Sequence, residues 1–226
     1  MFESNKKLEE YITKYTENED DILKELNRKT FLETFNPRMI CSPLQGKILQ
    51  MLSNMISPKY ILEIGTFTGY SAICLARGLK KDGKLFTIEI NDELTKYSQN
   101  FFEKAKLQNN IVQKVGDALE IIPKIDKNFD LVFIDADKER YLDYYKMIFD
   151  KVNIGGFIIA DNVLWEGKVV EENLPKNDFC TRGILEFNSF VNEDDRVENV
   201  IFPIRDGLMV LRKIWIINYE LWKRQK

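Results

Sequence analysis

The chain has 226 residues, of which 44% are hydrophobic and 31% are charged, a balance typical of globular proteins and unlike that of disordered chains. Its formal net charge of -3 excludes a global positive field that would gather nucleic acid or anionic lipid. Histidine is absent, which excludes histidine-based catalytic triads, bases and metal ligands. The length suits one α/β domain, so we expect residues 1–226 to form a single domain.

The first part of the chain, 1–57, is predicted to be helical. Helical patterns cover 8–15 and 20–35, and the second begins with acidic residues, which the helix dipole favours there. A third amphipathic helix is predicted over 43–56, with Ser42 as its cap and a proline at its first position. One face of this helix presents Leu44, Ile48, Met51 and Met55.

The segment 58–213 is predicted to form the core of the domain. Short β-rich apolar runs alternate with helical patterns, which is typical of βαβ units in a parallel sheet with helices on both faces. Near the end, strand-like runs at 196–204 and 208–213 have no room for a helix between them, so they require antiparallel pairing. We therefore predict an α/β fold with a seven-stranded, mostly parallel sheet and one antiparallel strand near its edge. The other predicted strands cover 60–65, 84–90, 110–115, 129–135 and 155–161, and the helices between them cover 71–79, 92–107, 117–125, 138–152 and 184–192.

Two further segments stand apart from this alternation. The irregular segment 164–179 follows a strand end, which makes it a candidate lid. The C-terminal extension 214–226 is aromatic and amphipathic, and we expect it to pack as an extra helix or at a subunit contact.

Cysteine usage and the start of the chain indicate a compartment. Cys41, Cys74 and Cys180 are odd in number and far apart, so neither a disulfide framework nor a zinc site is signalled. The start of the chain is charged and lacks the apolar region of a signal peptide, and no apolar run approaches the roughly 18 residues of a membrane span. We expect a cytoplasmic protein with no membrane partner.

The turn after the first predicted strand is a candidate ligand site. In sheets of this kind ligands bind beyond the carboxyl ends of the strands. Gly65 and Gly69 would let backbone approach a ligand closely, and Glu89 ends the next strand, where an acidic residue can accept hydrogen bonds from ribose hydroxyls. The dinucleotide pattern GxGxxG is absent because position 67 is Phe, and Glu63 is placed to engage the ammonium end of a zwitterion. Alternatively, the glycines only form a βα turn and both glutamates are solvated.

Oxygen-bearing side chains end two neighbouring predicted strands. Asp135 ends one strand, while Asp161 and Asn162 end the next. Adjacent parallel strands lie about 4.8 Å apart, so the three side chains can converge on one ion. Carboxylate and amide oxygens suit a hard cation, Mg²⁺ first, with Ca²⁺ or Mn²⁺ as alternatives. Alternatively, Asp135 caps the following helix and the Asp161-Asn162 pair turns the chain.

Lys138 follows Asp135 by three residues and is a candidate catalytic base. Its pKa, lowered by the cation and by desolvation, would let it remove a hydroxyl proton. Alternatively, it is a solvated helix lysine, and Asp137 only shapes the pocket. Trp165, in the following loop, either stacks on a planar substrate or packs against the protein.

The chain resembles the cation-dependent O-methyltransferases of the caffeoyl-CoA and catechol type, particularly their small bacterial members, from about Arg38 to Lys213. The resemblance rests on LEIGTFTGYSA, TIEIN, VGDALEIIP, FDLVFIDADKERY, GGFIIADNVLWEGKVV and RDGLMVLRK. It implies the Rossmann-like fold of class I methyltransferases, S-adenosylmethionine as cofactor, and Lys138 and Asp135 as catalytic residues. In the family the segment 39–42 covers the cofactor and the turn 116–118 borders its adenine. The implied cofactor-binding residues are Met39, Ser42, Glu63, Gly65, Thr66, Ser71, Glu89, Asp117, Ala118 and Asp135.

The function expected from these features is O-methylation that depends on S-adenosylmethionine and a divalent metal. A catechol-like small molecule is the first expectation for the substrate, and a hydroxylated uridine in tRNA is the alternative. A nicotinamide-dependent oxidoreductase is a remote alternative because GxGxxG is missing, and a non-catalytic cofactor-binding protein is disfavoured because the proposed metal ligands and base are all present. The apolar faces of the first helices, the aromatic extension and the resemblance indicate a homodimer.

Overall fold

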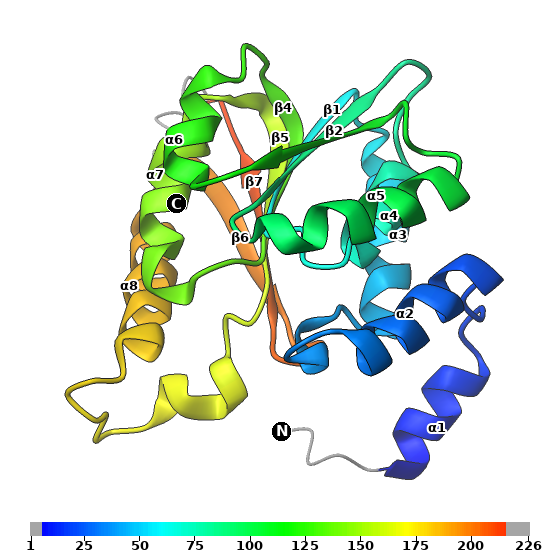
Figure 1. Ribbon diagram of the computed structural model, residues 1–226. Helices are drawn as coiled ribbons and strands as arrows, with labels where there is room; N and C mark the ends of the chain where they lie inside the picture. The colour runs from blue at the N-terminus through cyan, green and yellow to red at the C-terminus, as the bar shows by residue number, and fades with distance from the viewer. Residues whose placement is uncertain (1–5, 216–226) are drawn as a thin grey trace.

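The computed structural model describes residues 6–215 and contains a seven-stranded sheet in the order β3-β2-β1-β4-β5-β7-β6 (Figure 1). Each neighbouring pair from β3 to β5 is parallel. The strand order reverses between β1 and β4, and ligands bind at such switch points. The strands are β1 (Tyr60–Ile64), β2 (Lys84–Glu89), β3 (Ile111–Val115), β4 (Phe129–Ile134), β5 (Val152–Ala160), β6 (Val197–Phe202) and β7 (Leu208–Lys213).

β7 is the antiparallel strand of this sheet. It pairs antiparallel with β5 on one side and with β6 on the other. The connection 203–207 leaves no room for a helix, so the chain turns back beside the strand that it has just left. The prediction of a mostly parallel seven-stranded sheet with one antiparallel strand near its edge is confirmed.

Helices cover both faces of the sheet. In Figure 1, α2 to α5 lie on one side of the strands, and α6, α7 and α8 lie on the other. The helices are α1 (Lys6–Lys14), α2 (Asp21–Glu33), α3 (Pro43–Ile56), α4 (Tyr70–Ala76), α5 (Thr95–Lys104), α6 (Ala118–Ile121), α7 (Tyr141–Phe149) and α8 (Phe179–Glu193). Short 3-10 helices are η1 (Pro37–Met39), η2 (Asp92–Leu94), η3 (Ile122–Lys124), η4 (Lys138–Arg140) and η5 (Trp165–Val170).

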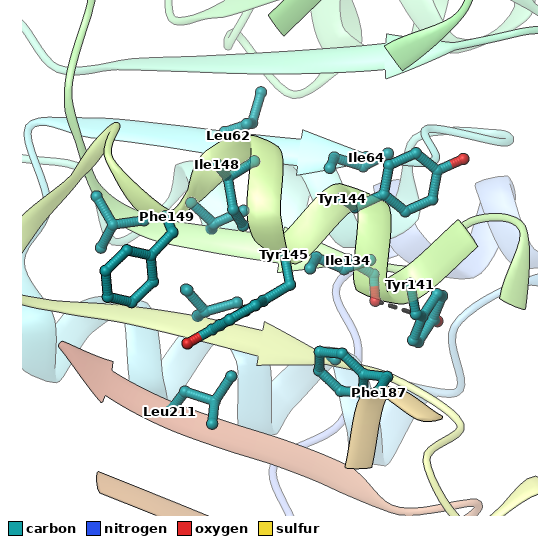
Figure 2. Close-up of a cluster of buried hydrophobic side chains, with 14 of the residues drawn as sticks. Leu62, Ile64, Ile134, Tyr141, Tyr144, Tyr145, Ile148, Phe149, Phe187 and Leu211 are labelled. Carbon is teal, nitrogen blue, oxygen red and sulfur yellow. Dashed lines mark hydrogen bonds between the residues drawn. The ribbon is translucent and has the colours of Figure 1, made fainter. Parts of the chain in front are cut away.

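Each face of the sheet carries its own cluster of buried apolar side chains. On the α7–α8 face, the rings of Tyr141 and Tyr145 both meet the ring of Phe187 edge to face (Figure 2). Such aromatic pairs stabilise a core by about 0.5–1.5 kcal/mol beyond the burial of their area. Because both faces are covered, the central strands are mainly apolar, as in FDLVFI of β4, where Asp130 is the one charged residue. The strand ends therefore project from a rigid base.

The ends of most elements agree with the sequence predictions within a few residues, and α3 has the predicted bounds. Two larger differences occur. β5 begins at Val152, which we expected to end a helix, because the pairing with β4 shifts between Phe129↔Val152 and Leu131↔Phe157 and leaves an irregular stretch in the strand. α8 begins at Phe179, before the predicted start at 184, because Asp178 caps it.

The buried face of α3 is not the predicted apolar face. Met51 and Met55 are exposed. Close packing against α4 explains the difference, since a Cβ on Gly46 would lie 2.5 Å from the Tyr70 ring. The side chains and glycine that α3 buries are Gln45, Gly46, Leu49 and Ser53.

Residues 216–226 of the C-terminal extension, where a helix or subunit contact was expected, lie outside the described residues. Between residues 6 and 215, no helix has both the length and the apolar character needed to cross a membrane. Cys41, Cys74 and Cys180 are free thiols.

Candidate active site

The turn from β1 into α4 brings the ends of β1 and β4 together. Gly65 has a φ of +100°, and a Cβ there would lie 2.0 Å from the carbonyl oxygen of Asp135. Glycine is therefore required for this close approach. Phe67 also has a positive φ, and its amide donates a hydrogen bond to Glu89 Oε2 at 2.7 Å. Glu89, at the end of β2, thus stabilises the turn that follows β1.

Glu63 is a buried acid with one unsatisfied oxygen. Thr87 Oγ1 donates to its Oε2 at 2.6 Å, whereas Oε1 has no hydrogen-bond partner within the described part of the chain. Burial raises the pKa of Glu63 to about 8, and the Thr87 hydrogen bond offsets only part of this rise. A buried carboxylate oxygen without a donor is suited to a cationic group such as a ligand ammonium.

Three other residues predicted to bind the cofactor near Glu63 are polar and buried. Thr66 and Ser71 are buried, and the Thr66 hydroxyl is hydrogen-bonded to that of Thr87. Glu89 is also buried, and its Oε1 accepts from the amide of Asn91 at 3.0 Å. Each carboxylate oxygen of Glu89 has a second lone pair, so the residue can also accept from hydroxyl groups of a ligand.

The outer residues predicted to border the cofactor have structural partners of their own. Met39 is 62% exposed in η1, and the Ser42 hydroxyl accepts from the amide of Gln45 at 3.3 Å as the cap of α3. Asp117 caps α6 and pairs with Arg140 at 2.8 Å. Ala118 is buried. Ser42 and Asp117 therefore use part of their hydrogen-bonding groups to cap helices.

Two carboxylates lie at the ends of β4 and β5. Asp135 and Asp161 directly follow Ile134 and Ala160, which are paired in register. Asp161 is 5% exposed, and burial together with the nearby charge of Asp135 raises its pKa to about 6. The alternative that Asp135 caps the next helix is wrong, because Asp137 is that cap and accepts from the amide of Glu139.

The chemistry of these side chains fits a hard divalent cation. No cluster of three or more Cys, Asp and Glu side chains suited to a metal occurs among residues 6–215, so an ion here would be held by two carboxylates and neutral oxygens. Asn162, in the left-handed region at φ 57°, supplies an amide oxygen next to Asp161. Burial first, and the negative charge of Asp135 second, raise the pKa of Asp161, and a cation between the two carboxylates would offset both effects.

Lys138 is buried between the two carboxylate ends. Its Nζ donates to Asp135 Oδ1 at 2.8 Å and to Tyr141 Oη at 2.6 Å, and Tyr141 in turn donates to the carbonyl oxygen of Asp161 at 2.9 Å. Burial lowers the pKa of Lys138, but the charge of Asp135 and the contact with Tyr141 more than offset this, so the pKa is raised. The lowered pKa that the sequence analysis expected for Lys138 is therefore not found in the protein without a cation.

Trp165 begins η5, inside the predicted irregular segment, with a φ of 46°. It is partly buried, and Lys168 Nζ lies 6.0 Å from the centre of its ring. The segment begins directly after the β5 end that carries Asp161 and Asn162. Trp165 follows Asn162 by three residues, and this proximity in sequence keeps its ring a candidate substrate wall.

Sequence reasoning missed three polar residues of this site. Tyr141 lies one helical turn after Lys138, a spacing that could have indicated a shared face. Gln45 donates from Nε2 to Asp161 Oδ2 at 2.6 Å and accepts from Arg205 at 2.9 Å. The signal for Gln45 was a polar residue on the helix face that also carries Leu49. Arg205 had no local signal, because its partner is 160 positions away.

Comparison with known proteins gives consistent results. A family model described as O-methyltransferase matches residues 13–214. Caffeoyl-CoA O-methyltransferase 1 of Nicotiana tabacum is 37% identical over 210 residues, covering 87% of this chain and 86% of that protein. The O-methyltransferase TomG of Streptomyces achromogenes, solved with SAM, has a TM-score of 0.86 at 28% identity and covers 95% of this chain and 100% of its own. An O-methyltransferase of Bacillus cereus, solved with SAH, has a TM-score of 0.85 at 30% identity, with coverage of 94% and 100%.

Proposed function

Because the chain belongs to the O-methyltransferase family that includes the caffeoyl-CoA O-methyltransferases, we propose that it methylates a hydroxyl of a catechol-like small molecule with the help of a divalent cation. The chain is an S-adenosylmethionine-dependent O-methyltransferase. The cation and the catechol are the proposed parts. The observation that carries them is the pair Asp135 and Asp161 at adjoining strand ends, with buried Lys138 bonded to the first.

The cofactor half of the site fits S-adenosylmethionine. The unsatisfied Oε1 of Glu63 would receive the ammonium of the methionine portion, and Glu89 would accept from the ribose hydroxyls. S-adenosylmethionine supplies the methyl group on an electrophilic sulfonium and leaves as S-adenosylhomocysteine. The tight turn at Gly65 places this half directly beside Asp135.

The cation would be held by Asp135, Asp161 and Asn162, with Mg²⁺ first and Ca²⁺ or Mn²⁺ as alternatives. A divalent cation there supplies positive charge that lowers the pKa of a substrate hydroxyl and competes with Lys138 for the Asp135 carboxylate. With Asp135 engaged by a cation, that carboxylate would no longer offset the burial of Lys138, and burial would then favour the neutral amine.

Lys138 then acts as the base. Its amine accepts the hydroxyl proton, while the Tyr141 hydroxyl keeps the amine between the two strand ends. Rigid placement of these groups by β4, β5 and α7 supplies the orientation on which methyl transfer depends. The products are a methyl ether, S-adenosylhomocysteine and a proton that Lys138 passes to solvent.

Two neighbouring hydroxyls on an aromatic ring fit this site, because both oxygens can approach the cation while the ring lies against a wall such as Trp165. The relatives' name supports this choice, since a caffeoyl group carries two adjacent phenolic hydroxyls.

We also propose a homodimer, because exposed apolar side chains gather on the first helices and the loop that follows, among them Tyr11, Leu32, Phe35 and Met55. Light scattering of the full chain tests the dimer.

A substrate panel tests the proposed function. The purified chain is incubated with S-adenosylmethionine and Mg²⁺ and with caffeate esters, catechol, matched monophenols and undermodified tRNA, and products are identified by mass spectrometry. We expect methylation of the vicinal diphenols only, because a monophenol lacks the second oxygen. Methylation of tRNA alone would overturn the small-molecule assignment, and equal methylation of monophenols would overturn the chelating role of the cation.

A further inference from the structure

The turn between β6 and β7, residues 205–207, lies against the segment that follows the Asp161 strand end. The amide of Leu164 donates to the carbonyl oxygen of Asp206 at 2.9 Å, and the amide of Val163 donates to that of Gly207 at 3.2 Å. A Cβ on Gly207 would lie 2.5 Å from the Leu164 side chain, so the approach requires glycine. The 205–207 turn is therefore fixed beside the proposed cation site.

A chain of hydrogen bonds runs from this turn to Asp161. Arg205 donates to Gln45 Oε1 at 2.9 Å, and Gln45 Nε2 donates to Asp161 Oδ2 at 2.6 Å. Gln45 is only 1% exposed, so its bond to Asp161 lies in a low-dielectric environment, whereas Arg205 reaches it from the surface. Arg205 has a φ of 50°, a strained conformation that persists only where surrounding contacts hold it.

A glutamine suits the middle of this chain for an electrostatic reason. Its amide accepts from a cationic side chain at one end and donates to a carboxylate at the other, so both ends fix its orientation. A glutamate at position 45 would place a third negative charge beside Asp135 and Asp161. The neutral amide instead orients Asp161 through a 2.6 Å hydrogen bond without adding a charge to the Asp135 and Asp161 pair.

The same turn also contacts the second ligand residue of this strand end. Asn162 Nδ2 donates to Asp206 Oδ2 at 3.4 Å, and the amide of Glu166 donates to Asp206 Oδ1. Of the two ends of the Asn162 side-chain amide, only the NH₂ group can donate to a carboxylate, so Asp206 determines which way this amide faces. The oxygen of Asn162 is thereby left available to a cation.

We propose that the 205–207 turn, acting through Gln45 on Asp161 and through Asp206 on Asn162, is a positioning device for the cation ligands. The inference rests on the proposed function, since it concerns the same cation. Partners behind the direct ligands fix the orientation of ligand oxygens, and their loss costs about 10- to 100-fold in metal affinity in proteins generally. Arg205, Gln45 and Asp206 are positioning residues because none of them is among the proposed ligands.

The test measures Mn²⁺ binding to the full chain by electron paramagnetic resonance of the free ion, alongside S-adenosylmethionine binding by calorimetry. Gln45→Met keeps the side-chain length and removes both hydrogen bonds, and it should weaken Mn²⁺ binding about tenfold or more. Arg205→Met should weaken it roughly threefold, because it acts only through Gln45. Cofactor affinity should stay within about twofold of the wild type, because Glu63 and Glu89 are untouched.

Coupling distinguishes positioning from general damage. Arg205→Met should have no further effect in the Gln45→Met background, and Arg205→Lys, which can still donate to Gln45, should restore Mn²⁺ affinity. The matched control is Arg212→Met, at the far end of β7, where the arginine pairs only at the surface with Glu198. This control should bind Mn²⁺ as the wild type does.

The outcomes separate the two proposals. If the wild type binds Mn²⁺ and the folded Gln45→Met and Arg205→Met variants bind it equally well, the positioning role is overturned and the proposed function stands. If the wild type itself binds no Mn²⁺, the cation part of the proposed function is overturned, and the positioning role with it. Should Gln45→Met not fold, the surface variant Arg205→Met and its lysine rescue decide alone.

Discussion

The two halves of the site, one at the ends of β1 and β2 and the other at the ends of β4 and β5, are built in different ways. The first half is local, since Glu63, Thr87 and Glu89 lie within one βαβ unit and bond to one another or to the turn between them. The second half is assembled across the fold, because Asp161 is held by Gln45, 116 positions away. Residues that could bind a ligand can thus be predicted from the strand ends in the sequence. The residues that hold them in place are brought together only by the fold.

The halves also differ in charge balance. Glu63 is buried without a cationic partner, and its pKa rises to about 8. Asp161, beside Asp135, has a raised pKa of about 6, although Lys138 is bonded to its neighbour. Each half is therefore suited to a cationic group, the first to an ammonium and the second to a divalent ion. Substitutions in one half should leave binding in the other half largely intact.

The largest expected effect comes from Asp161→Ala. It removes a proposed cation ligand, so turnover should fall at least about a thousandfold, as befits loss of charge stabilisation in a low-dielectric site. Cofactor affinity should change by less than about threefold, because the cofactor half is separate. Turnover assays and calorimetry check both numbers. Equal losses of turnover and of cofactor binding would contradict the independence of the two halves.

Lys138→Met should lower kcat by about 10²- to 10⁴-fold, the usual contribution of a positioned base. Cofactor and Mn²⁺ binding should persist, because the ammonium is not a ligand for either. The matched control is Lys146→Met on the exposed part of α7, which should retain full activity. A Lys138→Met enzyme with near wild-type kcat would remove this residue from the chemistry.

Glu63→Gln should weaken S-adenosylmethionine binding by about tenfold or more, because glutamine cannot ionise, whereas Glu63 can give up its proton when the ammonium binds. Mn²⁺ affinity should stay unchanged. Calorimetric titrations of both ligands provide the measurement. A variant that binds the cofactor as tightly as the wild type would show that Glu63 is only a buried structural acid.

The same substitution has a pH-dependent effect on stability. The folded pKa of Glu63 is about 8 and the ordinary value is 4.5, so between these limits the unfolded chain ionises while the folded chain keeps its proton. Stability contributed by this group is full below pH 4.5 and is lost as pH rises towards 8. The melting temperature of Glu63→Gln minus that of the wild type should therefore grow from pH 5 to 8, by roughly 10 °C, and then level off. A difference independent of pH would contradict the buried, protonated acid.

The smallest expected effect comes from Asp117→Asn. Asparagine remains a good helix cap, and both side chains of the lost pair with Arg140 are partly open to solvent, so stability should change by about 1 kcal/mol or less. Cofactor affinity should fall by no more than about threefold, since the residue only borders the expected adenine position. Denaturant unfolding and calorimetry check these values, and a loss beyond tenfold would make Asp117 a principal ligand.

The fold was predictable from the sequence because its signals are local. The alternation of apolar strands and helices predicted the sheet, and the short connection 205–207 predicted the antiparallel strand. Local signals also identified the strand-end residues Glu63, Asp135 and Asp161, although their roles remain predictions. The start of β5 at Val152 was not, because it depends on an irregular pairing with β4 rather than on composition.

The partnership of Gln45 and Arg205 with Asp161 could not be predicted, because it acts across a long separation in sequence. Gln45 and Arg205 meet only because α3 and the 205–207 turn both reach the end of β5. The raised pKa of Lys138 in the protein alone follows from its contacts with Asp135 and Tyr141, which a sequence does not show. Side-chain electrostatics therefore needed the structure, even where residue identity did not.

The dependence of turnover on a divalent cation tests the central claim most directly. The full chain is freed of metal with a chelator and assayed with S-adenosylmethionine and a vicinal diphenol while Mg²⁺ is added back. We predict no turnover in excess chelator and saturable recovery with Mg²⁺, with no recovery in Asp161→Ala. Full activity of the wild type in excess chelator would contradict the account.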